Sequence, residues 1–295
     1  MSTRASTIAS AAAPPRPRAE FARRLLRHRA ATAGLLVLVV LALAAAFAPL
    51  LTPYDPTAQR LADALLPPGP GHPLGTDHLG RDLLARILFG ARYSLFMGFG
   101  AVVIGLAVGV PVGALSGFYG GWVDLLAQRV VDVLLAFPGF LLALSLVAAL
   151  GVGLTNVVLS VGIGSIPAFV RLVRASTLSL REQAFVEAAR CVGCGDARII
   201  ARHVLPNTFA PVIVQATLGL GSAILVAAGL GFLGLGVQEP TPEWGTMLGD
   251  GRQYLFAAAH VATFPGLAIF SAVLAFNLAG DGLRDAIDPQ LRGGT

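Results

Sequence analysis

The sequence predicts an all-α integral membrane protein with six transmembrane helices, and two observations carry this prediction. Of its 295 residues, 55% are apolar and only 13% are charged, and the mean hydropathy is +0.75. Long segments without a charged residue alternate with polar segments. Each charge-free segment is long enough for one or two helices that cross a hydrocarbon core of about 30 Å. The same composition excludes a disordered chain and argues against a soluble globular domain.

Residues 1–29 form an Arg/Ala/Pro-rich tail that contains seven Arg and a single acid, Glu20. We interpret it as a disordered cytoplasmic tail in which residues 20–29 could form a basic interfacial helix. A specific binding arm is the alternative interpretation. The charge-free segment 30–51 follows as the first predicted span and is too long for the apolar region of a secretory signal peptide. Because Arg collects on the cytoplasmic side of membrane proteins, the tail indicates a cytoplasmic N-terminus.

The next segment, 52–92, is rich in proline and balances four Arg against four Asp, as expected of an outside loop. From residue 79 onward its apolar residues recur at helical spacing, which predicts an interfacial helix leading into the second span. The apolar face of this helix would contain Leu79, Leu83, Leu84, Ile87 and Leu88. Arg81, Asp82 and Arg86 would lie off that face.

The remaining spans follow from charge-free segments. Residues 133–170 carry no charge, and as one helix at 1.5 Å per residue they would measure about 57 Å, so they predict a hairpin with its turn at 151–156. A short link at 118–132 precedes this hairpin, and a polar loop is expected at 239–254. The predicted membrane domain covers 30–290, with spans at about 30–51, 94–117, 133–151, 155–173, 209–235 and 258–280.

The distribution of arginine orients these spans. Of the 21 Arg, sixteen fall in segments that six spans place inside and five in segments placed outside. The positive-inside rule therefore puts both termini and the charged stretch 171–208 in the cytoplasm.

The second half of that charged stretch is expected to form a helix, a turn and a second helix. Ser179 and Glu182 have the spacing of a capping box that would start the first helix at residue 180. The glycines at 193 and 195 predict the turn. Asp196 would cap the second helix, which Pro206 would end.

The first of these helices presents small residues and one acid. Ala184, Ala188 and Ala189 predict a surface that a partner can approach closely, and Glu187 adds one fixed negative charge to it. Cys191 and Cys194 are interpreted as packing residues rather than a redox pair or half a zinc site, because no second pair of ligands exists and the cytosol is reducing. No metal site is expected.

The chain contains no lysine at all. A phosphate-binding loop of the G-x-x-x-x-G-K-[ST] type and lysine-based covalent chemistry are therefore excluded, so that ATP, if used, binds to another chain. The pI near 10 does not indicate nucleic acid, because the basic residues lie in the tail and the central loop without interleaved aromatic residues.

The central stretch resembles the "EAA" loop of ABC importer permeases. The match consists of Glu187-Ala188-Ala189, of Gly193 six residues after the glutamate, and of Leu205-Pro206. The sequence R-H-x-L-P-N at 202–207, with His203 where the general pattern has Ile, is similar to the peptide and nickel branch of that family.

A second match lies in the outside loop. Gly75-Thr76-Asp77 and Gly80-Arg81-Asp82 resemble the C-type permease subunit of dipeptide, oligopeptide and nickel importers. The segments 232–236, 244–245 and 280–285 agree as well, so the resemblance covers about residues 33–290.

The resemblance implies a type I ABC importer permease fold and a subunit without catalytic activity that forms half of a translocation pore in the bacterial inner membrane. It implies docking of an ATPase on a coupling helix, through Glu187, Ala188, Ala189, Gly193, His203, Leu205 and Pro206. The implied partners are a homologous second permease, two ATPase subunits that carry ATP and magnesium, and an extracytoplasmic binding protein. Alternating access is the implied mechanism and di- or oligopeptides the implied solutes.

Three alternatives belong beside this reading. Nickel or glutathione would replace the peptide as the solute. A secondary transporter would need ionisable groups in mid-membrane, where these spans carry none. An intramembrane enzyme would need a reactive constellation, which the isolated His260 and Ser271 do not supply.

Overall fold

The computed structural model describes residues 28–287. Residues 1–27, which make up nearly all of the predicted tail and most of its interfacial helix at 20–29, lie outside the described part, as do the last eight residues. Within that part the chain is helical and contains no β-strand. The helices are α2 (Arg29–Ala46), α3 (Ala48–Leu51), η1 (Leu61–Asp63), α4 (Leu83–Tyr119), α5 (Gly121–Leu135), α6 (Gly139–Leu150), α7 (Leu154–Arg181), α8 (Ala184–Cys191), α9 (Asp196–Ile199), η2 (Ile200–Val204), α10 (Leu205–Phe232), α11 (Trp244–Gly251), η3 (Arg252–Tyr254) and α12 (His260–Ile287).

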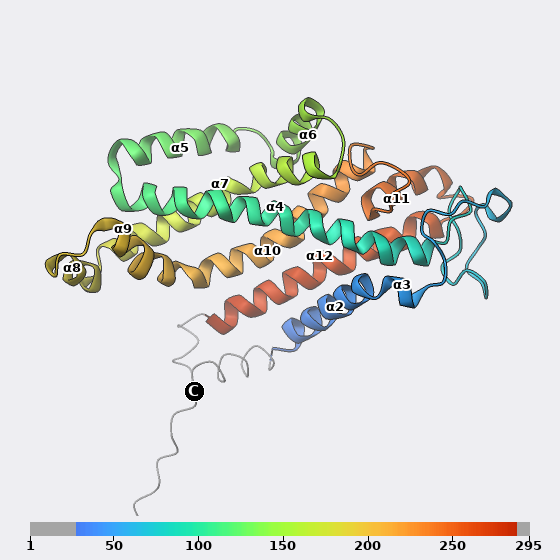
Figure 1. Ribbon diagram of the computed structural model, residues 1–295, viewed down its shortest axis with the longest axis horizontal. Coiled ribbons are helices and arrows are strands. Elements are labelled where there is room, and N and C mark those ends of the chain that lie inside the picture. Colours follow the sequence, from blue (N-terminus) through green and yellow to red (C-terminus); the bar gives the residue numbers. More distant parts are fainter. Residues whose placement is uncertain (1–27, 288–295) are drawn as a thin grey trace, which may run out of the picture.

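The long helices form an elongated bundle with two distinct ends (Figure 1). Helices α8 and α9 lie at one end, beyond the ends of α4 and α7. The loop 52–82 and α11 lie at the opposite end. We call these the docking end and the loop end.

Five helical stretches are long and apolar enough to cross a membrane: α2, α4, α7, the run from α9 through α10, and α12. The pair α5 and α6 supplies a sixth span if it is counted as one, although its two helices meet at 88°. The bend lies at Pro138, which precedes α6 and has no amide hydrogen to continue the hydrogen bonds of α5. The prediction of an all-α membrane fold with six spans is thus confirmed, with the third span broken.

Helices α4 and α7 approach each other closely because glycine recurs at every fourth position of α4. A Cβ atom on Gly109, Gly113 or Gly117 would come within 2.5–2.8 Å of an atom of α7. In lipid, where apolar side chains gain little by leaving the solvent, such small-residue contacts let helices pack by close approach. This close helix contact was not predicted from the sequence.

Three buried apolar clusters hold the bundle together. The central cluster joins α4, α6, α7 and α10 around residues such as Met97, Phe169 and Ile224. The cluster at the loop end surrounds Trp244, and the cluster at the docking end surrounds Val186 and Ile199.

Three sequence expectations for the polar segments are wrong. The interfacial helix expected from residue 79 does not exist separately, because α4 begins at Leu83, after its N-cap Asp82, and runs unbroken to Tyr119. The link at 118–132 is mostly the helix α5. The polar loop at 239–254 contains the helix α11, whose first residue Trp244 is fully buried.

Candidate functional site

The helix α8 at the docking end starts later than expected. The capping box at Ser179 and Glu182 does not form, because α7 stays helical through Arg181 and α8 begins at Ala184 without a side-chain cap. Leu180 packs against the cluster at the docking end. Burial of this side chain favours continuation of α7 past Ser179 over a new start there.

The turn after α8 has the geometry that its glycine predicts. Gly193 has a φ of +81°. The amide of Cys194 donates to the carbonyl of Ala189 at 3.0 Å, and the amide of Gly193 donates to that of Arg190 at 2.9 Å. These two bonds form a Schellman motif, which satisfies the last carbonyls of a helix and needs a left-handed residue at this position.

Pro206 does not end a helix, contrary to expectation. The helix from Asp196 continues through a π-helical segment at Ile200–Val204, whose end is marked by the amide of Leu205 donating to the carbonyl of Ile200. Pro206 then lies in the first turn of α10, where a missing amide hydrogen costs nothing. The side-chain amide of Asn207 donates to the His203 carbonyl at 2.6 Å.

The predicted docking residues divide into an exposed group and a packed group. Glu187, Ala188, Gly193 and Pro206 are exposed, whereas His203 and Leu205 are half-buried. Ala189 is buried, so it does not belong to the small-residue surface predicted for α8. It faces the bundle because Val186 and Ala189, three residues apart, lie on one side of the helix.

The buried face of α8 fastens it to the bundle. Val186 and Ala189 share a cluster with Phe118 of α4 and Val173 of α7. The guanidinium of Arg190 lies 5.4 Å from the centre of the Phe118 ring. Arg181 donates to the carbonyl of Gly117 at 3.1 Å, so the last residue of α7 is bonded to the end of α4.

The two cysteines form no disulfide, and no cluster of metal ligands occurs among residues 28–287. Cys194 packs beside the docking-end cluster, in agreement with its predicted packing role, whereas Cys191 is exposed. His260 and Ser271, which were weighed as reactive groups, bond instead to backbone carbonyls.

At the loop end, the second motif folds into a tight turn before α4. Gly75 and Gly80 have φ values of +78° and +71°. A Cβ atom on Gly80 would lie 1.8 Å from the carbonyl oxygen of Arg60, so only glycine fits there. Asp82 accepts the amide of Ala85 at 2.7 Å and caps α4, and the Thr76 hydroxyl donates to the carbonyl of Asp63.

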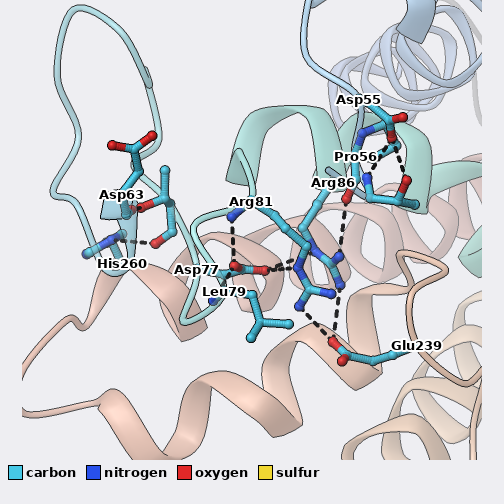
Figure 2. A network of polar contacts seen from close by, with 11 residues as sticks. Asp55, Pro56, Asp63, Asp77, Leu79, Arg81, Arg86, Glu239 and His260 are labelled. Atoms are coloured by element: carbon cyan, nitrogen blue, oxygen red, sulfur yellow. Dashed lines mark hydrogen bonds and ion pairs between the residues drawn. The ribbon is translucent and has the colours of Figure 1, made fainter. Parts of the chain in front are cut away.

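Four charged side chains form a buried network behind this turn, which we call the loop-end network: Asp77, Arg81, Arg86 and Glu239. Figure 2 shows both guanidinium groups between the carboxylates of Asp77 and Glu239. Arg81 reaches Asp77 Oδ2 with Nε and Glu239 Oε1 with Nη2, both at 2.6 Å. Arg86 lies 3.4 Å from Asp77 and donates to the Pro56 carbonyl at 3.2 Å.

The network lies deeper than the sequence pattern suggested. The Arg81 and Arg86 side chains are each only 1% exposed, whereas the Glu239 side chain is 40% exposed. Placed off the predicted apolar face, both arginines were expected outside the core. They are buried because Asp77 of the same loop and Glu239, which is 158 residues from Arg81 in the chain, supply opposite charge on both sides.

A further acid of the loop end, Glu243, was missed in the sequence. It is fully buried and caps α11 by accepting the amides of Gly245 and Thr246, each at 2.8 Å. It also accepts the hydroxyl of Ser94 at 3.1 Å and thereby ties α11 to α4. Burial raises the pKa of the Glu243 carboxyl. Glutamate is not among the residues that usually cap a helix N-terminus, so the local sequence held no clear signal for this cap.

Three buried polar atoms beside the network have no partner among the described residues: His78 Nδ1, Arg81 Nη1 and Asp250 Oδ2. All three residues line one small closed cavity of about 10 Å³. Burial, with the nearby charge of Glu239, raises the pKa of Asp250.

Comparison with known proteins finds a family and close relatives. Residues 109–293 match the model of the "binding-protein-dependent transport system inner membrane component", and residues 16–68 match the "N-terminal TM domain of oligopeptide transport permease C". A dipeptide transport system permease of Alkalihalophilus pseudofirmus is 48% identical over 94% of this chain and 91% of its own. A glutathione transport system permease of Pectobacterium atrosepticum is 50% identical over 94% and 92%.

Solved structures support the fold. A chain of the MetNI methionine ABC transporter in an inward-facing conformation matches with a TM-score of 0.55 and 21% identity, over 69% of this chain and 97% of its own. A chain of an amino acid ABC transporter matches with a TM-score of 0.52 and 16% identity, over 68% and 93%.

Proposed function

The chain belongs to the family of inner membrane components of binding-protein-dependent transport systems, the permeases of ABC importers, and from this premise we propose that it forms half of the path by which a peptide-like solute enters the cell. The proposed solutes are di- and oligopeptides or glutathione. Relatives named for dipeptide and glutathione transport match nearly the whole chain at 48% and 50% identity, which supports this choice.

The proposed assembly contains a second, homologous permease, two ATPase subunits and an extracytoplasmic binding protein. The family description, which names a binding-protein-dependent system, supports the binding protein. The absence of lysine supports separate ATPase chains, because a phosphate-binding loop needs that residue. We propose a non-catalytic role for the chain itself, in a bacterial inner membrane with both termini in the cytoplasm.

We propose that α8 and the turn at Gly193 are the surface on which an ATPase docks. One observation carries this proposal: α8 is a short helix with one face packed on the bundle and the other exposed at the end of the molecule. Glu187 and Ala188 lie on the exposed face. A partner that binds this face therefore contacts a helix that is packed on the bundle rather than a free loop.

The packing of α8 explains how movement of the ATPase would reach the membrane. Val186, Phe118, Val173 and Val204 meet in one cluster and come from α8, α4, α7 and η2, the segment that leads into α10. Because a close-packed interior transmits displacement instead of absorbing it, a shift of α8 moves the cytoplasmic ends of three spans together. This coupling is what alternating access requires of the subunit.

The test is the change Glu187→Ala in the complete importer, reconstituted with its binding protein in proteoliposomes. Glu187 is exposed and has no ion pair within residues 28–287, so its removal should leave folding unchanged. We expect uptake of a labelled dipeptide to fall about tenfold or more while ATP hydrolysis continues. Glu182→Ala, which removes another exposed acid just before α8, is the matched control and should transport normally. Normal uptake by Glu187→Ala would refute the docking role of this residue.

A further inference from the structure

A groove in the middle of the bundle lies along α10. Helices α6, α7, α10 and α12 enclose a cavity of about 450 Å³. A second cavity of about 470 Å³ shares Gln215 and Leu218 with the first and reaches Arg284 on α12. The two cavities therefore adjoin along α10, and we call them together the groove, which extends toward the docking end.

One face of α10 lines this groove over most of its length. Pro211, Gln215, Leu218, Ser222 and Val226 all border it and recur every three or four residues. Fifteen residues of α-helix span about 22 Å, at 1.5 Å per residue. The lined stretch thus accounts for much of a hydrocarbon core of about 30 Å.

Two polar side chains in the groove have no hydrogen-bond partner within residues 28–287. These are the amide of Gln215 and the hydroxyl of Ser222. Thr217 of the same helix, by contrast, donates to the Ile213 carbonyl at 2.9 Å, and Asn277 of α12 donates to the Val273 carbonyl at 3.0 Å. An unpaired amide or hydroxyl is unfavourable in lipid, so these side chains indicate that the groove faces something polar.

The polar groups of the central cavity, the one of about 450 Å³, are uncharged. This cavity is lined by small and apolar residues together with Ser165, Gln215, Ser222 and Asn277, and by no acid, base, His or Cys. Divalent nickel would require imidazole, thiolate or carboxylate ligands, none of which is present there. Amide and hydroxyl groups instead complement the N–H and C=O groups of peptide bonds.

We propose that this groove is the chain's share of the solute path, and that Gln215 and Ser222 hydrogen-bond the peptide groups of a passing dipeptide or glutathione molecule. The inference rests on the proposed importer function and adds to it the lining residues and the chemical class of the solute. It also selects against nickel, which the sequence left open.

Transport measurements test the role of Gln215. In proteoliposomes that contain the complete importer, Gln215→Leu should lower uptake of labelled alanyl-alanine about fivefold to tenfold, as expected for one lost hydrogen bond. Assembly of the complex, followed by co-purification of its subunits, should stay unchanged. Thr217→Val, on the same helix but outside the groove, is the control and should transport normally. Normal uptake by Gln215→Leu, or an equal loss in Thr217→Val, would overturn the role given to Gln215.

Thiol labelling tests the groove independently of the solute. In the complete importer, after replacement of Cys191 and Cys194 by serine, Ser222→Cys should react with a small water-soluble methanethiosulfonate reagent. Leu225→Cys should not react, because Leu225 lies on another face of α10, where its exposed side chain is expected to face lipid rather than water. If Ser222→Cys is labelled in the isolated chain but not in the complete importer, another subunit fills the groove. That result would overturn the proposal.

The two experiments test the identity of the solute and the role of the groove separately. If the unmodified importer takes up neither alanyl-alanine nor glutathione while Ser222→Cys is labelled, the proposed solute is wrong and the water-filled groove stands. If uptake is normal but Ser222→Cys is not labelled, the groove is wrong and the importer function stands.

Discussion

The two ends of the molecule use their motif residues in opposite ways. At the loop end, Asp77, Arg81 and Arg86 are buried in a network that fastens the loop 52–82 and Glu239 to the start of α4. At the docking end, Glu187 and Ala188 are exposed, and apolar contacts of Val186 and Ala189 hold α8 in place. Charge therefore fixes structure at one end and is exposed at the other.

This difference teaches that a charged motif does not by itself indicate a contact surface. Burial of a guanidinium is energetically costly unless carboxylates pair with it, so each member of the loop-end network depends on the others. An exposed carboxylate such as Glu187 contributes little to folding and is free to bind another chain. Substitutions at the two ends should consequently separate stability from coupling.

The largest effect is expected from Arg81→Leu. It removes the partner that reaches both Asp77 and Glu239 at 2.6 Å and leaves buried carboxylate charge behind. Breaking such a buried pair costs about 3–5 kcal/mol. Denaturant unfolding of the solubilised protein, followed by the fluorescence of buried Trp244, should report this loss.

The control for this prediction is Arg171→Leu. Arg171 pairs with Asp132 at 3.0 Å, but both side chains are more than half exposed. Exposed pairs contribute about 0–1 kcal/mol, so this variant should unfold almost as the unmodified protein does. Equal destabilisation by the two substitutions would contradict the contrast between buried and exposed charge.

A smaller but still large effect is expected from Gly80→Ala. The new Cβ atom would lie 1.8 Å from the Arg60 carbonyl oxygen, and φ at this residue is +71°. The backbone term alone costs about 1–2 kcal/mol, and the clash adds to it by displacing the turn. Gly71→Ala, in the same loop and with no atom within 4 Å of the new Cβ, should change the free energy of unfolding by less than about 0.5 kcal/mol.

Gly193→Val should have the smallest effect on the stability of the chain but a larger effect on its assembly with the ATPase. A Cβ atom there meets nothing within 4 Å, so the cost is only that of a left-handed residue, about 1–2 kcal/mol. Because the turn sets the direction in which the chain leaves α8, co-purification of the ATPase should nevertheless decrease. Gly195→Val, at a neighbouring glycine with φ of −71°, is the matched control. Retained co-purification in Gly193→Val would argue against docking at this turn.

Local rules predicted much of the fold. Charge-free segments located the spans, since crossing a bilayer requires a run of apolar residues whatever the neighbours are. Glycine predicted the turn at 193, because its conformational freedom belongs to the residue itself. The capping box at Ser179 failed since burial of Leu180 outweighed a signal of about 1 kcal/mol.

The sequence by itself determined the membrane class, the positions of the two motifs and the family that they resemble. Only the tertiary structure decided which motif residues are buried. Arg81 meets Glu239, and Ser94 meets Glu243, across about 150 residues of chain. Such pairings come from the packing of helices, and no periodicity within one segment encodes them. The same holds for the groove, which exists only where the faces of α6, α7, α10 and α12 meet.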